Sequence, residues 1–526
     1  MKRLSLFCLL ILFCSLANAQ FVQIAEGPVF PDPIPGVSKI LQMKNGNTMF
    51  LHINPDTAWN VHVYEAQYKA KTETYIEPAF GKLKSGNVEG IFEIKGDAVI
   101  MISNADENAI TLYRLIIDGT TGKLKEEKQI ASLKMNPAKK GDSKTIAAPK
   151  PGVHVRKDPS SENYAVAITN VFVSDTSKRI EIILFGNDNK EINRASYSSS
   201  TEKYKYLQYV DMAVIGIDKV AALIYGYNIK DKDEKEGELI FATLDKGAKA
   251  VVTSEMDYSN DLVMERGITR YDPQTKRMLM LSTAKVKSES GKTSAYLGFI
   301  DLSSRRLLTN TMVPGEKLEK KYGEVFGKGS EYLAVPQNLF INDNGTITII
   351  FEEMETLKEK NISGQSIRNV GVVTYDNDVE LKSSYFIPMD HYISDNLLQS
   401  FYQSGREFTG QQFLKDNQFK SSVYISDGHI SLVLLNDTEF NIGTTNYKAS
   451  RFKEINNADA FYYLLGGNTA VPRRQYVFGK PADNDSHKTG VFTVYDYDRA
   501  NNVLVTLKPE KDGAHSGVKL VWLQPN

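Results

Sequence analysis

The chain has almost no cysteine, which removes whole classes of site. Only Cys8 and Cys14 occur among 526 residues, and both lie in the apolar N-terminal segment. Once that segment is removed as a signal peptide, no disulfide can cross-link the remaining chain. Thiol nucleophiles and cysteine-ligated zinc or iron–sulfur centres are excluded for the same reason. We therefore expect stability to come from the burial of apolar side chains.

Long apolar runs are missing beyond the N-terminal segment. There, Lys2 and Arg3 precede the apolar stretch 4–16, and small residues follow at 17–19. This order is typical of a secretory signal peptide, and the stretch is shorter than the ~20 apolar residues of a membrane-spanning helix. We predict a signal peptide at 1–19 and a single domain at 20–526. The mature protein is expected in the periplasm or the extracellular space, without direct insertion into a membrane.

An excess of either charge is also lacking. The chain has 63 basic and 64 acidic residues and a formal net charge of −1. Such a balance gives no broad electrostatic attraction for nucleic acid or for an anionic membrane surface. Nucleic acid is therefore not an expected partner.

Catalytic motifs are scarce as well. None of the seven histidines stands in an H-E-x-x-H spacing, and neither a G-x-S-x-G elbow nor a phosphate-binding glycine pattern occurs. His52 and His62 belong to neighbouring predicted strands, and we interpret them as packed or surface residues. Glu352 and Glu353 are adjacent in a strand, so they point to opposite faces and cannot both reach one substrate. We interpret them as solvated glutamates at a strand end.

Metal-binding patterns are equally incomplete. Three segments place aspartates two residues apart, at 231 and 233, at 483 and 485, and at 496 and 498. A calcium loop needs five or more oxygen ligands at set positions, and none of the three segments supplies them. The sequence therefore predicts no metal, no cofactor and no identifiable catalytic residue, and it leans toward a protein that is not an enzyme.

A hairpin module recurs along nearly the whole chain. Each copy consists of an apolar strand, an Asp or Asn, a short polar turn and an alternating strand, as in Ile180–Phe185 with Glu191–Tyr197. The turn Asp343-Asn344-Gly345 is a strong hairpin signal because Asn-Gly accepts positive φ. Repetition of such units every 50–75 residues or so is typical of a β-propeller built from four-stranded blades. We predict an all-β chain of this architecture.

The chain ends suggest the number of blades. Seven units open near residues 40, 90, 153, 209, 268, 337 and 421. Three further strands, Gly490–Tyr497, Asn502–Leu507 and Gly517–Leu523, remain at the C-terminus, and one, Phe21–Ala25, remains at the N-terminus. Three strands plus one make an eighth blade closed by both ends, which removes open sheet edges. Eight blades are predicted, with seven as the alternative. For the segment Asp395–Phe408, the sequence is compatible with a short helix that ends near Gly405 and equally with an irregular connection between blades.

Two features of the chain are similar to those of a known group of proteins: the turn Asp343–Gly345 and the hairpin of Val372–Asp376 with Glu380–Ile387. In these features the chain resembles uncharacterised exported bacterial β-propeller proteins. The blades lack the Trp-Asp ending of WD40 repeats and the Asp box of sialidases. The resemblance implies a fold and transfers no catalytic residue or substrate.

Polar insertions between the second and third strands are the main functional lead. They lie at Asn228–Gly237, Lys285–Thr293, Glu355–Asn369 and Asp437–Asp459. Equivalent loops of a propeller emerge on one face, so we expect a crown of charged loops there, and loops on a rigid scaffold commonly bind partners. Tolerance of long loops without function is the alternative. The residues predicted to contact a partner are Lys230, Asp231, Lys232, Asp233, Glu234, Lys235, Lys358, Lys360 and Arg368.

Two functions are compatible with these features. The first is a non-enzymatic periplasmic interaction module that docks on an envelope or outer-membrane protein, such as a transporter or a secretion channel. The alternative is a carbohydrate- or other ligand-binding, or glycan-active, propeller that uses its central funnel. A funnel pocket that holds two or more converging carboxylates would favour the alternative, and a flat funnel mouth would favour the first function. The sequence alone favours the first.

Overall fold

The computed structural model describes most of the chain beyond the predicted signal peptide, which lies outside the described residues. The described residues are 21–33, 35–83, 86–106, 109–134, 152–170, 179–197, 203–204, 206–229, 235–258, 261–286, 293–327, 332–359, 362–394, 398–413, 417–438, 441, 449, 451–452, 455–483, 486–512 and 515–525. Within these ranges, no helix is both long and apolar enough to cross a membrane.

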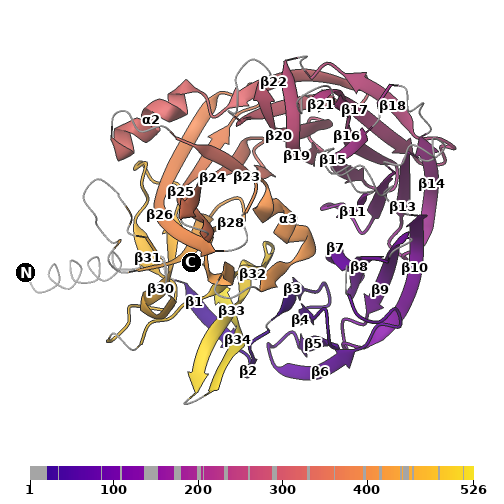
Figure 1. Cartoon of the computed structure of the whole chain (residues 1–526). Helices are drawn as coiled ribbons and strands as arrows, with labels where there is room; N and C mark the ends of the chain where they lie inside the picture. Colours follow the sequence, from indigo (N-terminus) through magenta and orange to yellow (C-terminus); the bar gives the residue numbers. More distant parts are fainter. Residues whose placement is uncertain are drawn as a thin grey trace, which may run out of the picture.

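Eight antiparallel sheets stand around a central axis, and the first strand of each sheet lies nearest that axis (Figure 1). Blades 1 to 4 are numbered in chain order. Their strands are β3 (Gly36–Gln42), β4 (Thr48–Ile53), β5 (Trp59–Tyr64) and β6 (Ala70–Ile76); β7 (Gly86–Ile94), β8 (Asp97–Ala105), β9 (Ala109–Ile117) and β10 (Leu124–Lys134); β11 (Gly152–Lys157), β12 (Tyr164–Thr169), β13 (Ile180–Phe185) and β14 (Glu191–Tyr197); and β15 (Tyr206–Ile215), β16 (Lys219–Ile229), β17 (Lys235–Asp245) and β18 (Val252–Met256).

Blades 5 to 8 continue the ring in the same way. Their strands are β19 (Leu262–Asp272), β20 (Arg277–Val286), β21 (Thr293–Asp301) and β22 (Arg306–Val313); β23 (Ala334–Ile341), β24 (Ile347–Glu359), β25 (Ile362–Tyr375) and β26 (Leu381–Ser394); β28 (Val423–Ser426), β29 (Ser431–Thr438), β30 (Ala458–Leu464) and β31 (Arg474–Tyr476); and β32 (Val491–Asp498), β33 (Val503–Asp512), β34 (His515–Gln524) and β1 (Val22–Glu26). The predicted eight-bladed propeller is confirmed, and the seven-bladed alternative is wrong.

The two chain ends close the ring within blade 8, as predicted. Strand β1 pairs antiparallel with β34, with Val22 opposite Gln524 and Glu26 opposite Val521. The short strand β2 (Phe30–Pro31) pairs with β34 as well. The Trp522 indole N–H donates to Thr48 Oγ1 at 3.1 Å, which links blade 8 to blade 1.

The apolar core is divided into layers between neighbouring blades. Eight clusters of buried side chains occur among the described residues, and each is drawn mainly from two adjacent blades. Strand β4, for example, is buried along its whole length, since it is an inner strand with a blade on either side. The packing therefore stabilises contacts between blades more than any single sheet.

The connection between blades 6 and 7 departs from the regular pattern. It forms helix α3 (Tyr402–Thr409), which lies over the centre of the ring (Figure 1), then strand β27 (Gln411–Phe413) and the 3-10 turn η3 (Asn417–Phe419). Strand β27 pairs with β3 and so becomes a fifth strand of blade 1. The expected end of the helix near Gly405 is wrong, because the helix continues to Thr409 and ends before Gly410, whose φ is 86°.

Two further elements differ from the sequence prediction. Helix α2 (Glu316–Phe326), between blades 5 and 6, was not predicted; it buries Leu318 and Tyr322, one turn apart. A second short 3-10 turn, η6 (Ile455–Asn457), precedes β30. The predicted loop at Glu355–Asn369 is also largely strand, because β24 and β25 pair as far as Glu359 and Ile362. Arg368 on β25 forms an ion pair with Glu355 on β24, and the backbone ladder continues through this polar sequence.

Candidate ligand site at the central funnel

The inner strands place polar and charged side chains at the axis, where they meet helix α3. Most of these residues alternate in charge around the ring: Lys39 (β3), Glu89 (β7), Arg156 (β11), Asp211 (β15), Arg270 (β19), Asn338 (β23) and Asp496 (β32). Arg156 Nε lies 2.8 Å from Asp211 Oδ1, and Arg270 donates to Asn338 Oδ1 at 2.9 Å. Neighbouring blades are thus joined at the axis by charge-assisted bonds.

Helix α3 lies within this set of side chains. The guanidinium groups of Arg156 and Arg270 lie 4.2 and 5.8 Å from the centre of the Phe408 ring. Arg270 also donates to Ser404 Oγ at 3.0 Å. These cation–π and hydrogen-bond contacts hold α3 against blades 3 and 5.

A buried carboxylate anchors the start of α3. Glu352, on β24, is fully buried and accepts hydrogen bonds from Tyr402 Oη at 2.8 Å, Gln403 Nε2 at 2.9 Å and Ser422 Oγ at 2.7 Å. Burial raises the pKa of Glu352, while these donors oppose the rise. The single side chain therefore ties α3 and the entry to blade 7 onto blade 6.

The interpretation of Glu352 and Glu353 as solvated is wrong. Glu353 is 9 % exposed and accepts from Tyr322 Oη at 2.6 Å and Asn369 Nδ2 at 2.9 Å. Burial raises its pKa too. The sequence did not reveal the partners, because Tyr322 comes from the unpredicted helix α2. The two glutamates have separate sets of partners, in keeping with their expected opposite directions.

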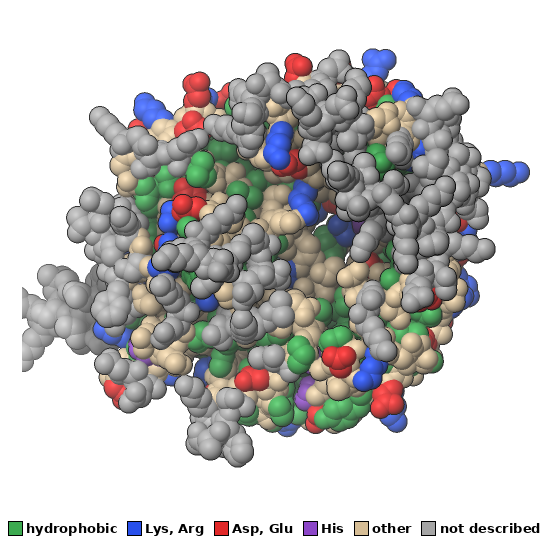
Figure 2. All heavy atoms as spheres, in the orientation of Figure 1, with side chains coloured by type: hydrophobic (Ala, Val, Ile, Leu, Met, Phe, Trp, Pro, Cys, Tyr) green, Lys and Arg blue, Asp and Glu red, His purple; other side chains and the backbone are tan. Residues whose placement is uncertain are grey.

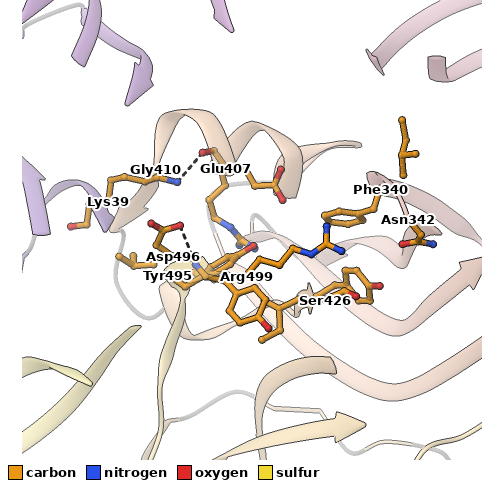
Figure 3. Close-up of a pocket in the computed structure, with 17 residues that line it drawn as sticks. Lys39, Phe340, Asn342, Glu407, Gly410, Ser426, Tyr495, Asp496 and Arg499 are labelled. Atoms are coloured by element: carbon orange, nitrogen blue, oxygen red, sulfur yellow. Dashed lines mark hydrogen bonds between the residues drawn. The ribbon is translucent and has the colours of Figure 1, made fainter. Parts of the chain in front are cut away.

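The other end of α3 forms one wall of a cavity of about 290 Å³ (Figure 3). Lys39 comes from blade 1, and Arg406 and Glu407 come from α3. Blades 6, 7 and 8 supply the other walls, namely Phe340, Ile341 and Asn342; Tyr424, Ile425 and Ser426; and Thr493, Val494, Tyr495, Asp496, Tyr497 and Arg499. Four blades and the connecting helix thus meet around one space.

Two carboxyl groups and an ammonium group line this cavity. Lys39 Nζ donates to the Glu407 carbonyl oxygen at 2.8 Å, and Glu407 Oε1 accepts from Asn338 Nδ2 at 2.6 Å. Asp496 Oδ2 accepts from the backbone N–H of Gln42 at 2.6 Å. A carboxylate offers about four acceptor positions, so both groups retain capacity for a further donor.

The surroundings shift the pKa values of the two carboxyl groups and of the ammonium group. Burial raises the pKa of Glu407 and of Asp496, and burial lowers the pKa of Lys39. In each case the charged form is disfavoured by desolvation and is partly stabilised by opposite charges nearby. These charges are Arg270 and Lys39 for Glu407, Lys39 for Asp496, and both carboxylates for Lys39. A ligand that supplies hydrogen bonds there would replace the water that the groups have lost.

Aromatic rings complete the cavity. The Phe340 and Tyr424 rings lie 5.0 Å apart at the boundary of blades 6 and 7, and Tyr495 and Tyr497 come from blade 8. Such rings provide flat apolar faces beside the polar groups. The cavity therefore combines hydrogen-bond donors, acceptors and stacking surfaces.

Only three of the residues predicted for partner binding are described by the structure. Lys230, Asp231, Lys232, Asp233, Glu234 and Lys360 fall outside the described residues, and Lys235 and Lys358 are placed in β17 and β24 by their backbone. Arg368 is in β25, with its guanidinium 2.8 Å from Glu355 Oε2 and 3.6 Å from Asp390 Oδ2. Of the predicted residues that the structure describes, none lines the funnel cavity, and docking of an envelope partner stays a prediction.

Sequence reasoning missed nearly every residue of the cavity. It considered Asp496 only together with Asp498, which instead accepts from the backbone of Ala500 and Asn501 in its own turn. A usable signal was present, because the first strands of some units carry one charged residue in an otherwise uncharged stretch, as at Lys39 and Asp211. Such a residue faces the axis when the strand is the innermost of its blade.

The two histidines of blade 1 have separate partners. His52 lies 3.0 Å from Ser38 Oγ through Nδ1, and the His62 ring stacks on Phe30 with centroids 4.6 Å apart. The interpretation of both as packed residues is confirmed. In the part of the chain that the structure describes, no group of three or more His, Cys, Asp or Glu side chains could hold a metal ion.

Comparison with known proteins shows similarity in fold alone. No protein-family model matches the chain, and no curated protein sequence matches it. Among solved structures, the polysaccharide lyase Uly1 is 8% identical over 86% of this chain and 93% of its own, with a TM-score of 0.38. An ulvan lyase of family PL25 is 10% identical over 86% and 98%, also at 0.38, and the phage phi92 endosialidase is 10% identical over 89% and 72%, at 0.35.

Proposed function

We propose that this propeller binds a polyhydroxylated ligand, a saccharide or a molecule of similar chemistry, in the cavity beside α3. The observation that carries the proposal is that two residues with carboxyl groups, Glu407 and Asp496, line one funnel cavity. A recess of this kind favours a ligand-binding funnel over a flat docking face. Of the two functions compatible with the sequence, we therefore favour the ligand-binding funnel over the interaction module.

The chemistry of the lining supports this class of ligand. Sugar hydroxyls both donate and accept, and here the carboxyl groups would accept while Lys39 and Arg406 would donate. The ring faces of Tyr424 and Tyr495 suit the apolar C–H face of a sugar. The volume of about 290 Å³ lies at the lower end of small-molecule sites, which suits one or two sugar units better than a long chain.

Charges of both signs are mixed over the described part of the face shown. Figure 2 shows Lys, Arg, Asp and Glu side chains intermixed around the rim of the ring. A mixed surface does not select a strongly charged macromolecule. The cavity, in contrast, brings donors and acceptors together in a recess, where hydrogen bonds to several walls can discriminate between ligands.

A panel of mono- and oligosaccharides, titrated by calorimetry against the whole protein, tests the proposal. We expect Asp496→Asn and Glu407→Gln to weaken binding of the best saccharide by roughly tenfold to a hundredfold, the value of a charge-assisted hydrogen bond. The matched control is Glu319→Gln, which makes the same chemical change on the exposed face of α2. Equal affinity in all three variants would contradict the proposal.

A further inference from the structure

A second cavity, of about 530 Å³, lies between blades 5 and 6. It is lined by the start of β23, whereas the funnel cavity is lined by the end of that strand, so the two cavities lie at opposite ends of β23. Residues 398–400, which lead into α3, form one of its walls. The site is therefore separate from the one described above.

The wall formed by the connecting segment is firmly held. The Gln365 side chain accepts from the backbone N–H of Leu398 at 2.8 Å and donates to the Leu398 carbonyl at 3.0 Å. The Phe401 N–H donates to the Pro336 carbonyl at 2.9 Å. These bonds fix the segment to β25 and β23, so the cavity is bounded by strands and an anchored segment.

One cation in this cavity has no matching anion in the described residues. Arg266 and Glu265 both line the space, but Glu265 lies 2.6 Å from Lys285 Nζ and accepts from Thr293 Oγ1 at 3.0 Å. Within the described ranges no carboxylate forms a salt bridge with Arg266. The Arg266 side chain is exposed overall, but desolvation on its covered side lowers its pKa, and only the charge of Glu265 opposes this change.

A buried hydroxyl, that of Thr283, lines the same cavity as Arg266. Thr283 stands directly opposite Arg266 in the β19–β20 pair, and residues in such a pair have their side chains on the same face. Thr283 is 3 % exposed, and its Oγ1 has no hydrogen-bond partner among the described residues. A buried polar atom without a partner costs free energy unless a water or a ligand satisfies it.

We propose that the cavity between blades 5 and 6 binds the anionic group, a carboxylate or a sulfate, of a small polar ligand. The Arg266 guanidinium donates two parallel hydrogen bonds to the anion, the geometry for which arginine is suited. The Thr283 hydroxyl donates a third. This site goes beyond the proposed saccharide site, and neither depends on the other.

The test uses D-glucuronate and inorganic sulfate as probes and D-glucose as the neutral counterpart, titrated by calorimetry against the whole protein. We expect one or both anions to bind and glucose to bind more weakly at this site. Arg266→Gln should weaken anion binding by roughly tenfold to a hundredfold. Arg306→Gln, on the exposed outer strand β22, should leave anion binding unchanged. Asp496→Asn, in the funnel cavity, should leave the binding of inorganic sulfate unchanged.

Thr283→Val gives an independent measurement. Without ligand this variant should melt at the wild-type temperature or above it, because it removes an unsatisfied hydroxyl, yet it should lose anion affinity. Glucuronate binding alone would identify a carboxylate ligand and sulfate binding alone a sulfate ester. Failure of both anions to bind the wild-type protein, or equal affinity in Arg266→Gln, would overturn the inference. Loss of sulfate affinity in Asp496→Asn instead would assign the anion to the funnel cavity.

Discussion

Replacing Trp522 by alanine should weaken the closure of the ring. Trp522 is fully buried in β34, its indole N–H donates to Thr48 of blade 1, and its ring lies 5.3 Å from that of Tyr64 and 5.1 Å from that of Tyr68. The side chain thus fills the layer between the last blade and the first. Its removal leaves a cavity at the one place where the ring is closed by strand pairing between the chain ends.

The expected loss is about 3–5 kcal/mol, the range for truncating a large buried aromatic residue to alanine. For a chain of 526 residues, an unfolding entropy of about 2 cal/mol/K per residue converts this loss into a melting temperature lowered by about 4 °C. Trp522→Phe keeps a ring but loses the bond to Thr48, so we expect a smaller decrease. Truncation after Pro509 should cost more, because it removes β34 from between β33 and β1.

Circular dichroism during heating measures the loss, and limited proteolysis shows where it acts. Trp59→Ala is the matched control, since Trp59 is 3 % exposed in the layer between blades 1 and 2. Both variants should melt earlier, but only Trp522→Ala should speed cleavage at 27–29, just after β1. An unchanged melting temperature for Trp522→Ala, or equal cleavage in the two variants, would refute the idea that the termini hold the ring closed.

Three further outcomes are expected. Burial raises the pKa of Glu89 from 4.5 to about 7, so stability should fall by up to about 3 kcal/mol as pH rises through that window, and Glu89→Gln should remove the loss in urea unfolding. Burial lowers the pKa of His391 from 6.5 to about 3, so this residue should make the protein less stable as pH falls through that window; His391→Asn should flatten that part of the acid profile. Replacing residues 230–234 with Asn-Gly should leave the melting temperature unchanged, because Ile229 and Lys235 are already paired; a lower value would show that the insertion supports the fold.

The blades could be predicted because each one carries its own local signals. The turn at Asn344-Gly345 is an example: Gly345 has a φ of 79°, and its N–H donates to the Asn342 carbonyl. Such turns, together with alternating strands, repeat along the chain and depend on neighbouring residues only. The terminal strand around Val22 was predicted for another reason, since a four-stranded blade lacked one member.

The connection between blades 6 and 7 could not be predicted in the same way. Its helix is stabilised by residues far away in the sequence, such as Arg156 and Arg270 against Phe408, rather than by a side-chain cap of its own. The long hairpin of blade 6 was mistaken for a loop because its polar sequence resembles one. Its strands persist because the backbone groups pair with each other, whatever the side chains.

The same reasoning explains why the cavity could not be predicted from the sequence and which part of the fold shapes the candidate binding sites. Turns and insertions at the blade edges change at little free-energy cost, since each is closed by its own strand pair. The connecting segment is different, because Gln365 fixes its start, Glu352 fixes the first turn of α3 and Lys39 contacts its last turn. A segment tied at three points to separate blades cannot shift without breaking buried hydrogen bonds. Since both cavities use this segment as a wall, their shapes depend on how the blades are arranged around the axis, which no single stretch of sequence encodes.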